Sequence, residues 1–125
     1  MWDGFNKRKF PRLNLQCEIS IEPPEPNMSP IVAVTENLGE GGVCVMQDRP
    51  LERFSRCHLR LEWDKKQPRI ECAGKVVWII PRRDPAGQQL KYDTGIEFQE
   101  MKPEDREKIR VFIQEILPKG FQQLV

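Results

Sequence analysis

Apolar residues alternate with polar or small ones in short runs along most of the chain, and this period of two constrains the fold more than any other feature. In the segments Cys57–Trp63 and Ile70–Trp78, every second residue is apolar or small. Neighbouring side chains of a β-strand point to opposite faces, so each run predicts a strand with one buried face. Gly74, inside the second run, predicts a bulge or a bend. Four further runs predict strands: Leu13–Ile21, Ile31–Thr35, Val43–Met46 and Tyr92–Phe98.

The segments between and after these runs predict loops and one helix. Pro23–Pro30 is rich in proline, which lacks the amide donor of a strand, and Pro81–Gln89 is polar, so both are expected to be loops. Pro103 and two acidic residues then open a segment of helical period, and we expect a helix over about 103–117. Its apolar stripe is more typical of core packing than of a partner groove: Ile109, Phe112, Ile113, Ile116 and Leu117. About six strands followed by one amphipathic helix predict an all-β domain, a small closed or nearly closed β-barrel covered by the helix.

Length and charge limit the classes of function. The 125 residues suffice for one domain, expected as an arm over 1–12, a barrel with its helix over 13–120 and a tail over 121–125. No apolar run is long enough to span a membrane, and no signal peptide is indicated, so no membrane insertion is expected. The net charge of +1 makes nucleic acid an unlikely partner. Four widely spaced cysteines indicate buried, reduced thiols and a cytoplasmic protein: Cys17, Cys44, Cys57 and Cys72.

Arg8 and Arg12 form the first candidate for a binding site. Pro11 disfavours helix at the residue before it, so the two arginines lie on extended or turning backbone. Their α-carbons would stand roughly 13 Å apart if the segment were fully extended. The guanidinium fork matches a phosphate or the O6/N7 edge of guanine. Taken on their own, the same residues are explained better by a basic arm that is simply solvated, because basic termini are common.

The segment Asn37–Gly42 forms the second candidate, a turn between two apolar runs. Gly39, Gly41 and Gly42 permit positive φ angles and close approach of the backbone, and could present amide N–H groups to an anion. Asn37 has the donor and acceptor atoms that a nucleobase edge requires. An ordinary glycine-rich hairpin turn is the alternative.

Other residues point more weakly to a function. Trp78 is explained most simply as core or rim packing, although its place late on a strand would also allow it to line a ligand surface. His58, the only histidine, has the outward parity and is expected to face solvent. No nucleophile with a paired base, no pair of carboxylates and no metal-ligand spacing is evident, so neither an enzyme nor a metal or cofactor site is predicted.

Taken together, these motifs resemble those of the PilZ domain family, bacterial receptor modules for cyclic di-GMP. Arg8 and Arg12 match the family's R-x-x-x-R motif, and Asn37 and Gly42 match the two ends of its [D/N]-x-S-x-x-G motif. The resemblance continues through Gly74–Trp78, Tyr92–Phe98 and the final helix. Four motifs in the family's order and spacing cover nearly the whole chain.

The resemblance implies a six-stranded antiparallel barrel with a C-terminal helix and a cyclic di-GMP site outside it. Arg8 and Arg12 would contact phosphates and guanine, Asn37 would hydrogen-bond a guanine edge, and Gly42 would keep the turn open. Lys7 precedes the arginines, where the family tends to set whether one ligand or a stacked pair binds. Binding would order the arm and change the surface that a protein partner meets.

Gly39 departs from the family pattern because it stands where the motif has serine. A lost neutral hydrogen bond costs about 0.5–1.5 kcal/mol, roughly tenfold in affinity at most. A backbone N–H or a water molecule could replace the hydroxyl. The alternative hypothesis is a degenerate PilZ-like module that binds proteins and no longer binds nucleotide.

Overall fold

The computed structural model describes residues 18–23, 28–62, 69–83, 87 and 89–116. Its elements are the strands β1 (Glu18–Glu22), β2 (Ile31–Leu38), β3 (Gly42–Gln47), β4 (Arg56–Glu62), β5 (Ile70–Arg83) and β6 (Leu90–Gln99), and the helix α2 (Pro103–Ile116). The predicted arm, residues 1–12, lies outside the described part, as do Leu13–Cys17, Trp63, Leu117 and the predicted tail.

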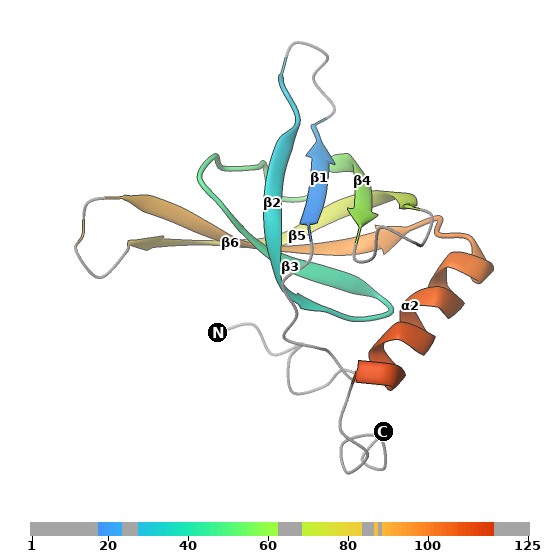
Figure 1. The fold of residues 1–125 in the computed structure, drawn as a ribbon. Helices are drawn as coiled ribbons and strands as arrows, with labels where there is room; N and C mark the ends of the chain where they lie inside the picture. Colours follow the sequence, from blue (N-terminus) through green and yellow to red (C-terminus); the bar gives the residue numbers. More distant parts are fainter. Residues whose placement is uncertain (1–17, 24–27, 63–68, 84–86, 88, 117–125) are drawn as a thin grey trace.

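The strands form a closed barrel in the order β1-β2-β3-β6-β5-β4, and every pairing is antiparallel. Pairing of β1 with β4 closes the barrel, so that Ile19 lies opposite Leu61. Closure leaves no free sheet edge around the barrel. The predicted all-β class, the six-stranded antiparallel barrel and the C-terminal helix are therefore confirmed (Figure 1).

The core consists of the inward side chains of all six strands and one stripe of α2. Ile109 and Ile113 of the helix are fully or almost fully buried in this core, with Met101 just before the helix. Phe112 packs against it from a partly buried position, as the helical spacing predicted. Cys57 and Cys72 are buried in the core as free thiols, and Cys44 is a buried free thiol outside it.

Strands β5 and β6 are longer than predicted and extend together beyond the barrel (Figure 1). The loop predicted from Pro81 is wrong at its start, because Pro81 belongs to β5 and pairs with Tyr92. Beyond Lys75, β5 has no register with β4, and Val76 is hydrogen-bonded there to Phe54 and Ser55 instead. Pro81 lies further along, at the part of the strand that extends beyond the barrel, where a residue without an amide donor is tolerated. The side chain of His58 is partly exposed, and its Nε2 atom lies 3.5 Å from Oε1 of Glu71. This position is consistent with the outward parity expected for His58.

The bulge predicted at Gly74 is also wrong. Gly74 keeps the regular register opposite Cys57 and Phe98, and the shift falls between Val76 and Trp78. A Cβ on Gly74 would lie 2.8 Å from side-chain carbons of both Leu59 and Ile96. The glycine therefore serves close packing inside the barrel.

Candidate functional site

Two bulges bring the candidate residues of the turn and of β5 onto one outer face of the barrel. The first bulge is in β2, where the register shifts between Thr35 and Asn37. Thr35 is inward and lies opposite Val45, a core residue, whereas Asn37 lies opposite Cys44, which points outward. Asn37 was predicted at the mouth of a turn, and the structure instead places it near the end of β2, because that strand continues to Leu38.

The second bulge is in β5 and reverses the side to which Trp78 points. Val76 lies inward opposite Ile96, but Trp78 pairs with Gly95 and so shares its outward side. Simple alternation from Ile70 would have placed Trp78 inside the barrel. Trp78 is only 8% exposed, yet it is not a member of the core cluster. The bulge thus excludes packing of Trp78 inside the barrel and leaves two of the sequence interpretations, rim packing and a ligand surface.

The strand registers align these positions in one row across four neighbouring strands. Asn37 of β2 faces Cys44 of β3, Cys44 faces Gly95 of β6, and Gly95 faces Trp78 of β5. Neighbouring strands are about 4.8 Å apart, so Asn37 and Trp78 stand roughly 14 Å apart at the two ends of the row. We call this row, Asn37–Cys44–Gly95–Trp78, the site row.

Trp78 lies directly on Gly95. A Cβ on Gly95 would overlap Nε1 and Cε2 of the indole and lie 2.8 Å from Cδ1. Glycine is therefore required for the aromatic ring to approach the strand this closely. The sequence prediction gave Gly95 no separate role, although a glycine within an alternating strand is a signal of such a close approach.

The turn between β2 and β3 is tighter than predicted and comprises residues 39–41. The amide of Gly39 donates to the carbonyl of Gly42 at 2.9 Å, and the amide of Phe98 donates to the carbonyl of Gly41 at 2.9 Å. Gly42 itself is the first residue of β3. A Cβ at Gly42 would lie 2.5 Å from the carbonyl oxygen of Ile96, so glycine is needed for close approach to β6. Among the described glycines only Gly87 has a positive φ, so the positive φ angles predicted in this turn are not observed.

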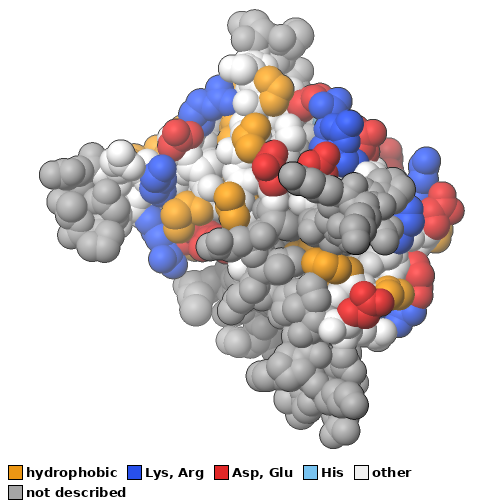
Figure 2. Space-filling model, viewed as in Figure 1, with side chains coloured by type: hydrophobic (Ala, Val, Ile, Leu, Met, Phe, Trp, Pro, Cys, Tyr) orange, Lys and Arg blue, Asp and Glu red, His pale blue; other side chains and the backbone are white. Residues whose placement is uncertain are grey.

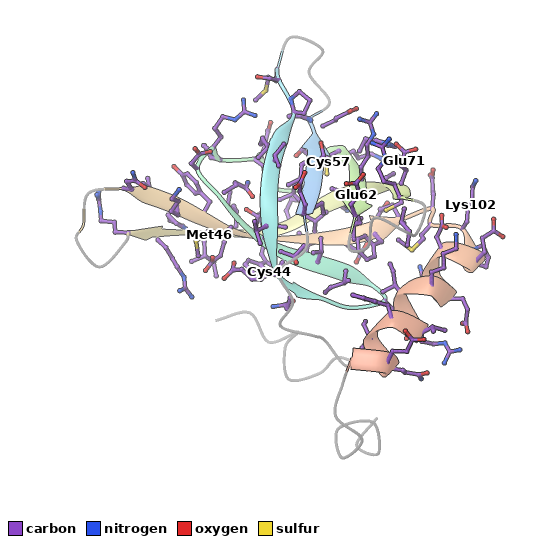
Figure 3. The ribbon with its side chains drawn as sticks, viewed as in Figure 1. Cys44, Met46, Cys57, Glu62, Glu71 and Lys102 are labelled. Carbon is purple, nitrogen blue, oxygen red and sulfur yellow. The ribbon has the colours of Figure 1, made fainter. Side chains whose placement is uncertain are left out.

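A pair of carboxyl groups adjoins the site row, although none was predicted from the sequence. Glu36 is the extra residue of the β2 bulge, and Asp93 lies on β6, where it faces Met46 of the intervening β3. Burial, a hydrogen bond to Asp93 and the negative charge of Asp93 raise the pKa of Glu36 to about 7. Figure 3 labels Cys44 and Met46, the two β3 residues of this region. The pairings of β2 with β3 and of β3 with β6 bring the two acids together, since no spacing in the sequence relates them.

Two further groups act on this pair. The guanidinium of Arg82 on β5 forms an ion pair with Oδ2 of Asp93, and the thiol of Cys44 donates to Oε1 of Glu36 at 3.6 Å. Both interactions lower the pKa of Glu36 and only partly offset its rise. Polar and charged groups therefore concentrate at the centre of this face.

A second row of outward residues lies next to the site row on the same four strands, and it is largely apolar. It runs from Val34 through Met46 and Asp93 to Ile80. Val34 and Ile80 are 49% and 41% exposed. On the side seen in Figure 2, hydrophobic side chains reach the surface in small separate patches between charged ones. The face thus combines apolar margins with an amide, an indole and a carboxyl pair, groups suited to a planar ligand that has polar edges.

Of the predicted site residues, the structure places Asn37 and Trp78 at the two ends of the site row on one outer face. Gly39 and Gly42 lie at the end of the β2–β3 hairpin, close to Asn37 in the chain. Lys7, Arg8 and Arg12 lie outside the described residues. Within the described part, no group of three or more histidine, cysteine or acidic side chains is arranged to hold a metal ion. No described helix is long and apolar enough to cross a membrane.

The fold defines a small antiparallel β-barrel domain with a helix packed on it. More particularly, a model of the PilZ domain family matches residues 6–115, and the chain belongs to this family. Comparison of the sequence with curated proteins finds no match.

Solved structures share this fold at low sequence identity. The PilZ domain of YcgR from Escherichia coli, solved with c-di-GMP, is 12% identical, with a TM-score of 0.72 over 88% of this chain and 91% of that one. The inhibitor of motility MotI/DgrA from Bacillus subtilis is 20% identical, with a TM-score of 0.71 over 90% of this chain and 52% of that one. The MrkH–c-di-GMP complex from K. pneumonia is 15% identical, with a TM-score of 0.69 over 93% of this chain and 55% of that one. This chain therefore spans about half the length of the last two.

Proposed function

We propose that this domain is a cytoplasmic receptor for cyclic di-GMP that signals to a protein partner and carries out no catalysis. The observation that carries the proposal is the alignment of Asn37 and Trp78 on one outer row of a PilZ barrel. The structures of the YcgR PilZ domain and of MrkH with c-di-GMP support the choice of ligand.

The proposed contacts follow from the chemistry of each side chain. The amide of Asn37 would hydrogen-bond one guanine edge, and the indole of Trp78 would offer an aromatic surface for stacking. Arg8 and Arg12 would bind phosphate or guanine with their planar forks, and Lys7 would influence whether one ligand or a stacked pair binds. Ordering of the arm on the ligand would then change the surface that a partner contacts, at some cost in affinity.

The structure sharpens the consequence of Gly39 in place of serine. Its amide N–H already donates to the carbonyl of Gly42, so it is not free to replace the missing hydroxyl. A water molecule or the amide of another turn residue would have to replace it. We therefore expect Gly39→Ser to tighten ligand binding by up to about tenfold, the equivalent of one neutral hydrogen bond.

Isothermal titration calorimetry with cyclic di-GMP tests the proposal. Binding is expected for the unmodified chain, and Arg8→Ala, Arg12→Ala and Asn37→Ala should each weaken it by about tenfold or more, as for loss of a charged or bidentate contact. Arg69→Ala is the matched control, because Arg69 is exposed and pairs only with Glu62, at 3.3 Å, among the described residues. This variant should bind normally. The molar ratio at saturation distinguishes one ligand from two.

The contrary result is the absence of heat at tens of micromolar protein, or equal affinity for GMP. Either outcome would refute selective cyclic di-GMP binding. Absence of heat would leave the second candidate, a PilZ-like module that binds only proteins, which the loss of the motif serine at Gly39 favours.

A further inference from the structure

The Glu36–Asp93 pair has one more acceptor than the surrounding donors satisfy. Asp93 is 5% exposed, and Arg82 binds its Oδ2 atom. When both acids are ionised, its buried Oδ1 atom has no N–H or O–H donor in the described part of the chain. A buried carboxylate oxygen without a donor is costly. A proton on the neighbouring Glu36 would supply the missing donor.

The charges around the pair also favour one proton on it. Two adjacent carboxylates in a partly buried site disfavour ionisation of both. The groups that act on Glu36 from the other strands are Asp93 on β6, Cys44 on β3 and Arg82 on β5. With one proton on the pair, the acids and Arg82 sum to zero charge, and without it they sum to −1. The proton therefore decides whether this part of the face repels an anion.

The pair lies close to where the ligand would bind. Cys44 is the second member of the site row, and its thiol contacts Glu36 directly. Asp93 is two residues from Gly95, the third member, on the same outward side of β6. Outward positions two residues apart on a strand are about 7 Å apart. A phosphate on the site row would thus lie within roughly 10 Å of the carboxyl pair.

We propose that Glu36 and Asp93 share a single proton and that this proton is coupled to ligand binding, so that the domain binds its anionic dinucleotide more tightly as the pH falls. The proposal rests on the proposed function for its ligand, and on the geometry of the carboxyl pair for its mechanism. Neither acid belongs to the residues that the family motifs mark.

Calorimetry with cyclic di-GMP at pH 6, 7 and 8 tests the coupling. The repulsion is that between one extra negative charge on the carboxyl pair and a phosphate roughly 10 Å away, in an effective dielectric of about 20. After reduction of this repulsion by salt, we expect about tenfold weaker binding at pH 8 than at pH 6. At pH 7 the apparent enthalpy should differ between phosphate and Tris buffers, because the complex takes up a fraction of a proton. Glu36→Gln, whose neutral amide can donate to Asp93, should bind equally well at all three pH values. Glu115→Gln is the matched control, an exposed acid on α2, and should keep the slope of the unmodified chain.

The outcomes separate this proposal from the proposed function. Binding that is independent of pH, or that tightens as the pH rises, refutes the coupling while leaving the receptor function intact. A slope that persists in Glu36→Gln refutes the assignment to this pair. No binding of either protein at any pH refutes the receptor function and the coupling together.

A readout without ligand tests the shared proton itself. In ¹³C NMR, the carboxyl carbon of Glu36 should titrate near neutral pH. Titration of Glu36 in the ordinary acidic range of an exposed glutamate would refute the shared proton.

Discussion

Replacement of Gly95 by alanine places a methyl carbon where the indole ring of Trp78 lies. The new carbon would overlap two atoms of the ring and lie 2.8 Å from a third. The ring must retreat by about 1 Å or more to restore ordinary carbon contacts of about 3.5–4.0 Å. It cannot do so without loss, because Trp78 is almost fully covered where it lies.

Two limits bound the free energy of unfolding that Gly95→Ala should cost. If the ring shifts but stays on the face, the cost is that of overpacking, about 1–3 kcal/mol. If it leaves the face, about 200 Å² of aromatic surface enters water, worth about 5 kcal/mol at 25 cal/mol per Å². We therefore expect Gly95→Ala to lower the free energy of unfolding by about 2–4 kcal/mol.

Urea unfolding followed by far-UV circular dichroism gives the free energy, and the indole N–H resonance of Trp78 in ¹H–¹⁵N NMR reports whether the ring has moved. Gly41→Ala is the matched control, since its Cβ would meet nothing within 4 Å and its φ is not positive. It should change stability by about 0.5 kcal/mol or less.

A double-mutant cycle isolates the contact between the two residues. In a Trp78→Ala background, Gly95→Ala has no ring to displace and should cost about 0.5 kcal/mol or less. An unchanged free energy of unfolding together with an unmoved indole resonance in Gly95→Ala would refute the packing of Trp78 on Gly95.

Two further predictions follow from raised pKa values. Because folding raises the pKa of Glu36 from 4.5 to about 7, its stabilising contribution is complete below pH 4.5 and is lost as the pH rises through 7. Allowing for solvent screening, the free energy of unfolding measured with urea should fall by about 1–2 kcal/mol over this range, and Glu36→Gln should abolish the fall. A gain in stability over the same range that depends on Glu36 would contradict the raised pKa. Burial raises the pKa of Cys57 to about 11 and of Cys72 to about 12, so in a Cys17→Ser/Cys44→Ser variant neither thiol should react with Ellman's reagent at pH 8 until denaturant unfolds the chain. Rapid reaction of the folded variant would show that these thiols are accessible.

The strands and the helix could be predicted from the sequence because they depend on local periodicity. Alternation predicted β4 and most of β5 and β6, and the proline, acids and apolar stripe predicted α2. The strand ends were less accurate, since pairing with a neighbouring strand extends β2 beyond Thr35 and β5 beyond Pro81. Such extension depends on the partner strand, which a local pattern does not contain.

The site was predictable only in part. Asn37 and Gly42 carried recognisable motif chemistry, but the function of glycine at position 42 is close approach to Ile96, which lies on a distant part of the chain. Gly95 was assigned no role because its contact with Trp78 depends on a register shift in β5. A bulge of one residue reverses the side of every residue after it, and alternation cannot locate it.

The sequence by itself determined the elements, the family and most of the residues worth testing, because propensity, period and motif spacing are properties of neighbouring residues. Only the tertiary structure decided that Asn37 and Trp78 share one face and that Glu36 meets Asp93 beside them. These relations arise from two bulges and from the pairings β2–β3, β3–β6 and β5–β6, which set the register between strands far apart in the sequence. The carboxyl pair, and with it the proposed sensitivity to pH, is a consequence of that register.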